Sequence, residues 1–153
     1  MKKLALLSIA AGLLITCPLF SSAQDKGVWR ASSSTATGIT GDIAIFDDKL
    51  SIDLTSFTIA EIRKLDPAEG AAAFNTDPHA PGGGYLYRLA VPAAKRFQHH
   101  NTLCGSEVTQ WMATYVQGRE LQVAFFSGSK MPVLTPDALA NSTDLCGTFT
   151  YSR

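Results

Sequence analysis

The side chains best suited to chemistry in this sequence are three histidines. His99 and His100 are adjacent, and His79 stands earlier in the chain. Neighbouring residues of a strand point to opposite faces, and no His-x-His or Glu-x-x-His spacing completes a ligand set. We therefore expect exposed loop histidines and no metal site. A small hydrolase that uses His99 or His100 with a carboxylate from another loop stays open as an alternative.

Two other segments carry partial motifs. Ser127 and Lys130 have the Ser-x-x-Lys spacing of penicillin-interacting enzymes, but the Ser-x-Asn and Lys-Thr-Gly elements that this chemistry needs are missing. Gly82, Gly83 and Gly84 do not follow a strand and open a helix, as a phosphate-binding loop would. We interpret the first segment as a hairpin end and the second as a flexible hinge. No catalytic residue and no cofactor are predicted.

The cysteines predict one disulfide. Cys104 and Cys146 each stand between a Leu and a Gly, and neither belongs to a Cys-x-x-Cys motif. A glycine beside each cysteine lets two backbones approach closely. Closing the loop between them would restrict the unfolded chain by about 4 kcal/mol.

The first 23 residues have the pattern of a secretory signal peptide. Lys2 and Lys3 precede an apolar run that ends at Phe20, and a small-x-small cleavage pattern ends at Ala23. Cleavage there removes Cys17 and leaves an exported domain, residues 24–153, in the periplasm or outside the cell, with no integral membrane span. The alternative is a lipoprotein anchored through Cys17.

The charge of the exported domain argues against nucleic acid as a partner. Of 13 Lys and Arg side chains, two leave with the leader, so 13 − 2 = 11 basic residues face 13 acidic ones. A domain of about −2 lacks the basic footprint that binds phosphate backbones.

Strand signals position these residues. Apolar and polar residues alternate in several short runs separated by turn residues, and no βαβ pattern occurs. We predict an all-β fold, a single antiparallel β-barrel or sandwich of about eight strands, with one disulfide and one short helical turn over residues 93–97. The predicted strands are 28–31, 39–46, 50–54, 57–65, 85–91, 108–116, 121–126 and 145–151.

The aromatic residues are assigned mainly to the core. Trp29 and Trp111 are expected to be buried, whereas Phe125 and Phe126 must point to opposite faces of their strand. In strand 108–116, one face takes Trp111, Ala113 and Tyr115, and the other takes Val108, Met112 and Val116. On 85–91, one face takes Tyr85, Tyr87, Leu89 and Val91.

Two long segments, residues 66–84 and 130–144, contain several Pro or Gly residues and are predicted to be loops. Loops held by a rigid scaffold concentrate binding residues, so these two form the candidate contact surface. Its candidate residues are His79, Gly82, Gly83, Gly84, Lys130 and Pro132.

In size, predicted export, β content and one late disulfide, the chain is similar in outline to small periplasmic β-barrel modules such as the C-type lysozyme inhibitors. No inhibitory motif of that family stands at a matching position, so the resemblance implies architecture alone. We expect a non-enzymatic exported binding module that contacts another envelope or extracellular protein. A small-molecule carrier with an open barrel is a further alternative.

Overall fold

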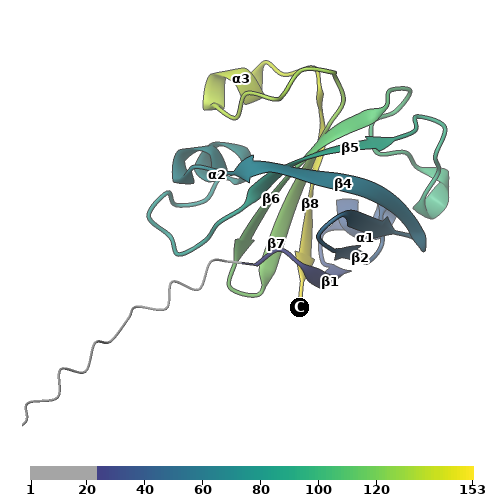
Figure 1. Ribbon diagram of the computed structural model, residues 1–153, viewed down its shortest axis with the longest axis horizontal. Helices are drawn as coiled ribbons and strands as arrows, with labels where there is room; N and C mark the ends of the chain where they lie inside the picture. The colour runs from purple at the N-terminus through teal and green to yellow at the C-terminus, as the bar shows by residue number, and fades with distance from the viewer. Residues whose placement is uncertain (1–23) are drawn as a thin grey trace, which may run out of the picture.

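Residues 24–153 are described by the structure, a computed structural model, and they form a closed barrel of eight antiparallel strands (Figure 1). The predicted signal peptide, with Cys17, lies outside the described residues. The all-β prediction is confirmed, and the architecture is a barrel. The strands are β1 (Gly27–Ala31), β2 (Ile43–Ile45), β3 (Lys49–Ile52), β4 (Thr55–Lys64), β5 (Tyr85–Val91), β6 (Thr109–Gln117), β7 (Glu120–Phe126) and β8 (Leu145–Ser152).

Each strand pairs with its neighbours in the chain, and β1 closes the ring by pairing with β8. Residues 27–29 pair with β2, whereas Arg30 and Ala31 pair with Ser152 and Tyr151 of β8. The connections therefore alternate between the two ends of the barrel. The end that carries the 32–42, 53–54, 92–108 and 127–144 connections is called the disulfide end below.

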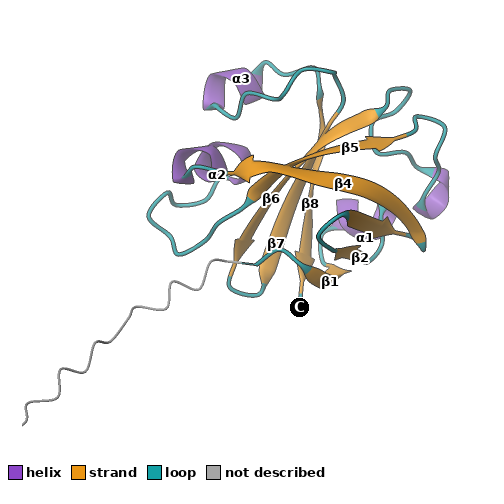
Figure 2. Cartoon of the chain, in the orientation of Figure 1, coloured by secondary structure: helices purple, strands orange, loops and turns teal. Residues whose placement is uncertain are grey.

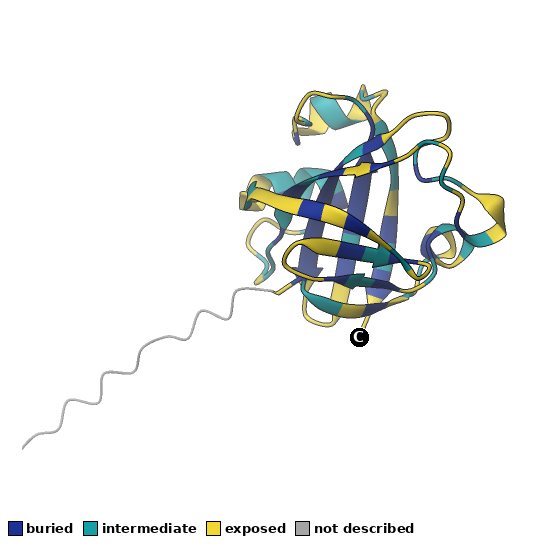
Figure 3. Ribbon diagram, turned by 45° about the vertical axis from the view of Figure 1, so that its right-hand side comes forward, coloured by how far each residue is buried: buried dark blue, intermediate teal, exposed yellow. Residues whose placement is uncertain are grey.

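The barrel strands carry many buried residues (Figure 3), and the apolar side chains among them pack into one cluster in the interior. Phe125 and Phe149 meet edge to face with their ring centroids 5.3 Å apart, and full burial of one such side chain contributes about 2 kcal/mol. The expected inward face of β5 is confirmed. Buried interior residues include Trp29, Ile43, Ile45, Leu50, Ile52, Tyr87, Leu89, Val91, Met112, Val116, Leu121, Val123 and Tyr151.

A second apolar cluster lies on the outside of the barrel, beneath two short helices. Phe126 points outward into this cluster, opposite to Phe125, as predicted. The two predicted faces of β6 are also confirmed, because Met112 and Val116 point into the barrel and Trp111, Ala113 and Tyr115 point outward. Val108 is the exception, since it precedes the strand and is exposed. The outer cluster consists of Leu65, Phe74, Leu86, Trp111, Ala113, Tyr115, Ala124, Phe126 and Leu134.

The helices were the least predictable elements. The structure has α1 (Ser34–Ile39), α2 (Pro67–Phe74), α3 (Pro136–Ala140) and a three-residue 3-10 turn, η1 (Gln98–His100). The prediction of a helical turn over residues 93–97 is wrong, because those residues form a turn and an irregular segment ahead of η1. Ile39 ends α1, so the strand predicted from 39 begins only at Ile43.

Both segments predicted to be loops contain a helix. In each, a proline occupies the first helical turn, where its missing N–H is tolerated, and it follows an N-cap residue, Asp66 in one and Thr135 in the other. The loop prediction took the Pro and Gly residues of both segments as loop signals. These prolines instead begin helices that the outer cluster then stabilises.

A buried carboxylate closes the end of the barrel opposite the disulfide end. Asp25 is 1% exposed, and its Oδ2 accepts hydrogen bonds from the hydroxyls of Tyr87 (2.8 Å) and Thr114 (2.6 Å). The Trp29 indole N–H donates to the Asp25 carbonyl oxygen at 2.8 Å. Burial and the nearby Asp25 charge raise the pKa of Tyr87 far above its usual range, so this phenol remains a donor. Sequence patterns gave no sign of this network, because Asp25 precedes the first strand.

Asp25→Ala is expected to lower the free energy of unfolding by about 2–3 kcal/mol, because it leaves two buried hydroxyl groups without an acceptor. Asp47→Ala is the control, because Asp47 is exposed and borders, together with Asp25, a hollow of about 260 Å³ at this end of the barrel. Its replacement should change stability by less than about 0.5 kcal/mol. Urea unfolding followed by tryptophan fluorescence measures both. Equal stabilities for the two variants would contradict the role of Asp25.

Candidate binding surfaces

The two predicted contact segments meet on one outer face of the barrel, where α2 and α3 contact each other (Figure 2). Phe74 of α2 packs against Tyr115, with ring centroids 6.0 Å apart, and Leu134 from the other segment is 2% exposed. Much of both segments is therefore a cover for the outer cluster. What remains for binding is the part that faces solvent.

The triglycine of residues 82–84 lies directly on β6. The backbone N–H and C=O of Gly83 pair with Val116 at 3.1 and 2.7 Å. A Cβ on Gly84 would lie 1.7 Å from the carbonyl oxygen of Thr114. The interpretation of this segment as a flexible hinge is therefore wrong, because the glycines are needed for close approach.

The rest of the first segment is more open. His79 is exposed, and its backbone N–H donates to Asp77 Oδ1 at 2.8 Å. A hollow of about 280 Å³ lies beside residues 82–84 and is bordered by Lys64 and Tyr115. The structure thus separates the exposed candidate His79 from the glycines, which are partly or fully buried.

Gly84→Ala is expected to cost about 3 kcal/mol of stability, because the new methyl group would overlap backbone that belongs to the barrel. Gly38→Ala is the matched control, since a Cβ there meets nothing within 4 Å and Gly38 lies in helix α1. That replacement should leave stability unchanged or raise it slightly. Thermal unfolding of both variants decides the point, and a Gly84→Ala protein as stable as the parent would refute it.

An ion pair anchors α2 to the end of β4. Arg63 donates two hydrogen bonds, of 2.6 and 2.7 Å, to the two carboxylate oxygens of Glu69. Glu69 also accepts a hydrogen bond from the Asp66 backbone N–H at 2.9 Å. The hydrogen bonds from Arg63 are the main cause that lowers the pKa of Glu69.

Because folding lowers the pKa of Glu69, its contribution to stability is complete above the pKa of an unfolded glutamate and is lost as the pH falls through the lower, folded value. For this partly exposed pair we expect about 1 kcal/mol, which is lost as the pH falls below about 4.3, the ordinary pKa of a glutamate. Glu69→Gln should reduce stability at pH 7 by that amount and should differ less from the parent in acid. Glu107→Gln, at an exposed and unpaired position among the described residues, is the control in urea titrations at several pH values.

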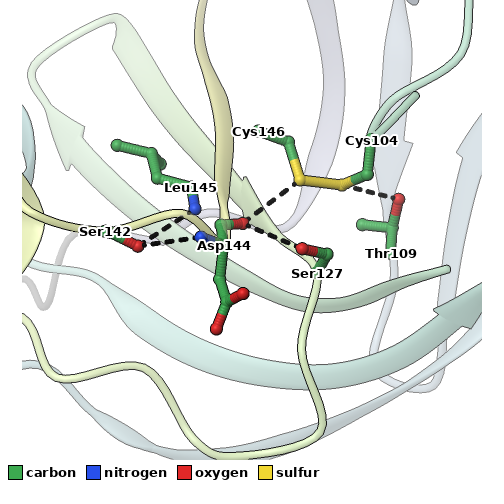
Figure 4. The surroundings of a disulfide bond; sticks show 7 residues. All are labelled: Cys104, Thr109, Ser127, Ser142, Asp144, Leu145 and Cys146. Carbon is green, nitrogen blue, oxygen red and sulfur yellow. Dashed lines mark hydrogen bonds between the residues drawn. A yellow bond between two sulfur atoms is a disulfide. The ribbon is translucent and has the colours of Figure 1, made fainter. Parts of the chain in front are cut away.

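The predicted disulfide between Cys104 and Cys146 is confirmed (Figure 4). It joins the β5–β6 connection to the start of β8, with a Cα–Cα distance of 5.0 Å. The Thr109 hydroxyl lies 3.1 Å from the Sγ atom of Cys104. The crosslink thus ties the β5–β6 connection to β8, just after the β7–β8 connection ends.

The β7–β8 connection, residues 127–144, is closed at its base beside this disulfide (Figure 4). The Ser127 N–H donates to the Asp144 carbonyl oxygen at 2.8 Å, and the Sγ atom of Cys146 lies 3.3 Å from the same oxygen. The Ser142 hydroxyl accepts hydrogen bonds from the N–H groups of Asp144 and Leu145. A long connection whose two ends are joined in this way holds a defined shape.

This connection exposes apolar side chains. Leu134 is buried in the outer cluster, whereas Met131 and Val133 are 47% and 63% exposed. Beside them lies a hollow of about 220 Å³. Its apolar lining comes from Phe126, Met131, Pro132, Val133, Ala138 and Leu139, and its charged lining from Lys130 and Asp144. The structure therefore places the candidates Lys130 and Pro132 together at this hollow.

The histidines are not assembled into a catalytic or metal site within residues 24–153. His99 and His100 are exposed, and no carboxylate lies within 4.0 Å of either ring among the described side chains. No group of three or more His, Cys, Asp or Glu side chains in this part of the chain is arranged to hold a metal ion.

The comparisons with known proteins give no relative from which a role could be transferred. No protein-family model matches the chain, and neither curated proteins nor solved structures gave a match. Within the described residues, no helix is long and apolar enough to cross a membrane.

Proposed function

We propose that the protein is an exported, non-enzymatic binding module that contacts another envelope or extracellular protein through its β7–β8 connection. The main support for this proposal is a pair of exposed apolar residues, Met131 and Val133, which lie beside an apolar hollow. The connection that carries them is held at its base by hydrogen bonds beside the disulfide. Exposed apolar groups around a concavity with a polar rim are typical of protein interaction sites.

The proposed partner presents an apolar side chain to the hollow and polar or charged groups to its rim. Lys130 and Asp144 carry opposite charges at the rim, so a segment with a carboxylate and a basic residue flanking its apolar anchor would be complementary. Export is supported by the leader pattern and by the disulfide, which persists in oxidising compartments.

The two alternatives have less support. A carrier needs an apolar cavity inside the barrel, whereas the interior side chains pack into one buried cluster. A histidine hydrolase needs a carboxylate close to His99 or His100, and both rings stand apart from the acidic side chains of the described chain.

A photo-crosslinking amino acid at Val133 tests the proposal in cells that export the protein. Val28 is the matched position, because it is exposed to nearly the same extent, 65% against 63%. We expect a crosslinked protein from position 133 that position 28 does not give. When the protein and its crosslinked partner are purified, Val133→Asp should weaken their binding by about tenfold or more, and Val28→Asp should not. Identical crosslinks from both positions, or an unchanged affinity for Val133→Asp, would overturn the proposal.

A further inference from the structure

The turn between β3 and β4 carries an apolar residue in an unfavourable place. Asp53 and Leu54 form a two-residue hairpin turn in which both residues have positive φ, +48° and +62°. Such turns favour Asn and Gly, because a Cβ is strained in the left-handed region. Leu54 is also fully exposed, so packing does not compensate for the strain. Neither the local backbone nor the core explains this leucine.

The neighbouring connection shows the same combination of strain and exposure. His99 and His100 are consecutive, exposed residues with φ of +53° and +61°. The side chain of Gln98 donates to Asp53 Oδ1 at 3.3 Å, which links this connection to the turn. Strained residues held by their surroundings concentrate at functional sites.

A lysine contacts the residue that follows the exposed leucine, and an exposed arginine is next to this lysine in the chain. Lys95 donates to the Thr55 hydroxyl at 2.8 Å, one residue from Leu54, and Arg96 donates to the Ala93 carbonyl oxygen at 3.0 Å. Neither cation lies within 4.0 Å of a carboxylate in residues 24–153. Asp53, on the turn itself, accepts its hydrogen bond from the neutral Gln98 amide and not from either cation. An apolar tip therefore projects beside Lys95 and Arg96, which form no ion pair in the described part of the chain.

From this arrangement we infer a second docking surface, the Leu54 tip, made of Leu54, Lys95, Arg96, His99 and His100. Its partner is a protein with an apolar pocket that admits one leucine side chain and is bordered by carboxylates. The charge of the tip argues for the acidic border, and a single projecting apolar side chain argues for a pocket. The Leu54 tip shares no residue with the hollow on the β7–β8 connection. Its charged side chains are basic, whereas that hollow has one basic and one acidic side chain, Lys130 and Asp144.

Substitution of Leu54 separates a binding role from a structural one. Leu54→Asn removes the apolar tip and introduces a residue that the turn favours, so the melting temperature should stay the same or rise while binding is lost. Arg96→Glu should weaken binding to the partner, and it should also make the affinity less sensitive to salt concentration. Lys49→Glu is the charge-matched control, since Lys49 is exposed on β3 away from the tip.

The experiment begins with a photo-crosslinking amino acid at residue 54 in exporting cells, with position 49 as the comparison, and continues with calorimetric titration of the purified partner. We expect Leu54→Asn to weaken binding by about tenfold or more and Arg96→Glu by about three- to tenfold, with Lys49→Glu and Val133→Asp unchanged. Mutation of carboxylates around the partner's pocket should give a similar loss.

Two further measurements address other occupants. Co-sedimentation with phosphatidylglycerol vesicles tests an anionic membrane, and sedimentation velocity tests a second copy of this chain. Vesicle binding or self-association that depends on Leu54 would overturn the inference. So would crosslinks shared by positions 54 and 49, or a partner that binds Leu54→Asn as tightly as the parent.

Discussion

Closure of the barrel between β1 and β8 is the constraint on which the rest of the structure depends. Residues 27–29 of β1 pair with β2, and only Arg30 and Ala31 pair with β8. The short seam is reinforced by Arg153, which donates to the carbonyl oxygens of Gln24 and Lys26 and lies over the Trp29 ring. Closure joins the two edge strands of the sheet and brings the inward residues of the strands into one cluster.

A filled barrel also determines where function can reside. Since the interior holds packed side chains, binding surfaces must lie on the outside or at the ends. The outer face of β5, β6 and β7 is covered by α2, α3 and the segments that carry them. That cover makes most of the two long segments structural and leaves Met131 and Val133 in solvent. The same arrangement gives the disulfide a role at the base of the exposed connection.

The two proposed surfaces differ in construction. One is a hollow on a long connection held by the outer cluster, and the other is a projecting leucine on a two-residue turn beside cations. Rigid support is common to both, because the hydrogen bonds of the barrel and the disulfide limit the motion of the strands to which they are attached. A small domain can in this way present two separate contacts without a ligand cavity.

Local patterns in the sequence were enough to predict the strand alternation, the two faces of β6, the opposite directions of Phe125 and Phe126, and the cysteine pair. These features follow from local periodicity and from parity of cysteines, which need no knowledge of distant contacts. Only the tertiary structure decided that the barrel closes, that residues 82–84 pack on β6, that the two long segments cover one outer face, and that Asp25 is buried beside Tyr87 and Thr114. Each of these features depends on surfaces that come together from distant parts of the chain. The local sequence around a glycine, a proline or a single aspartate does not differ between a residue that lies in solvent and one that packs against another strand.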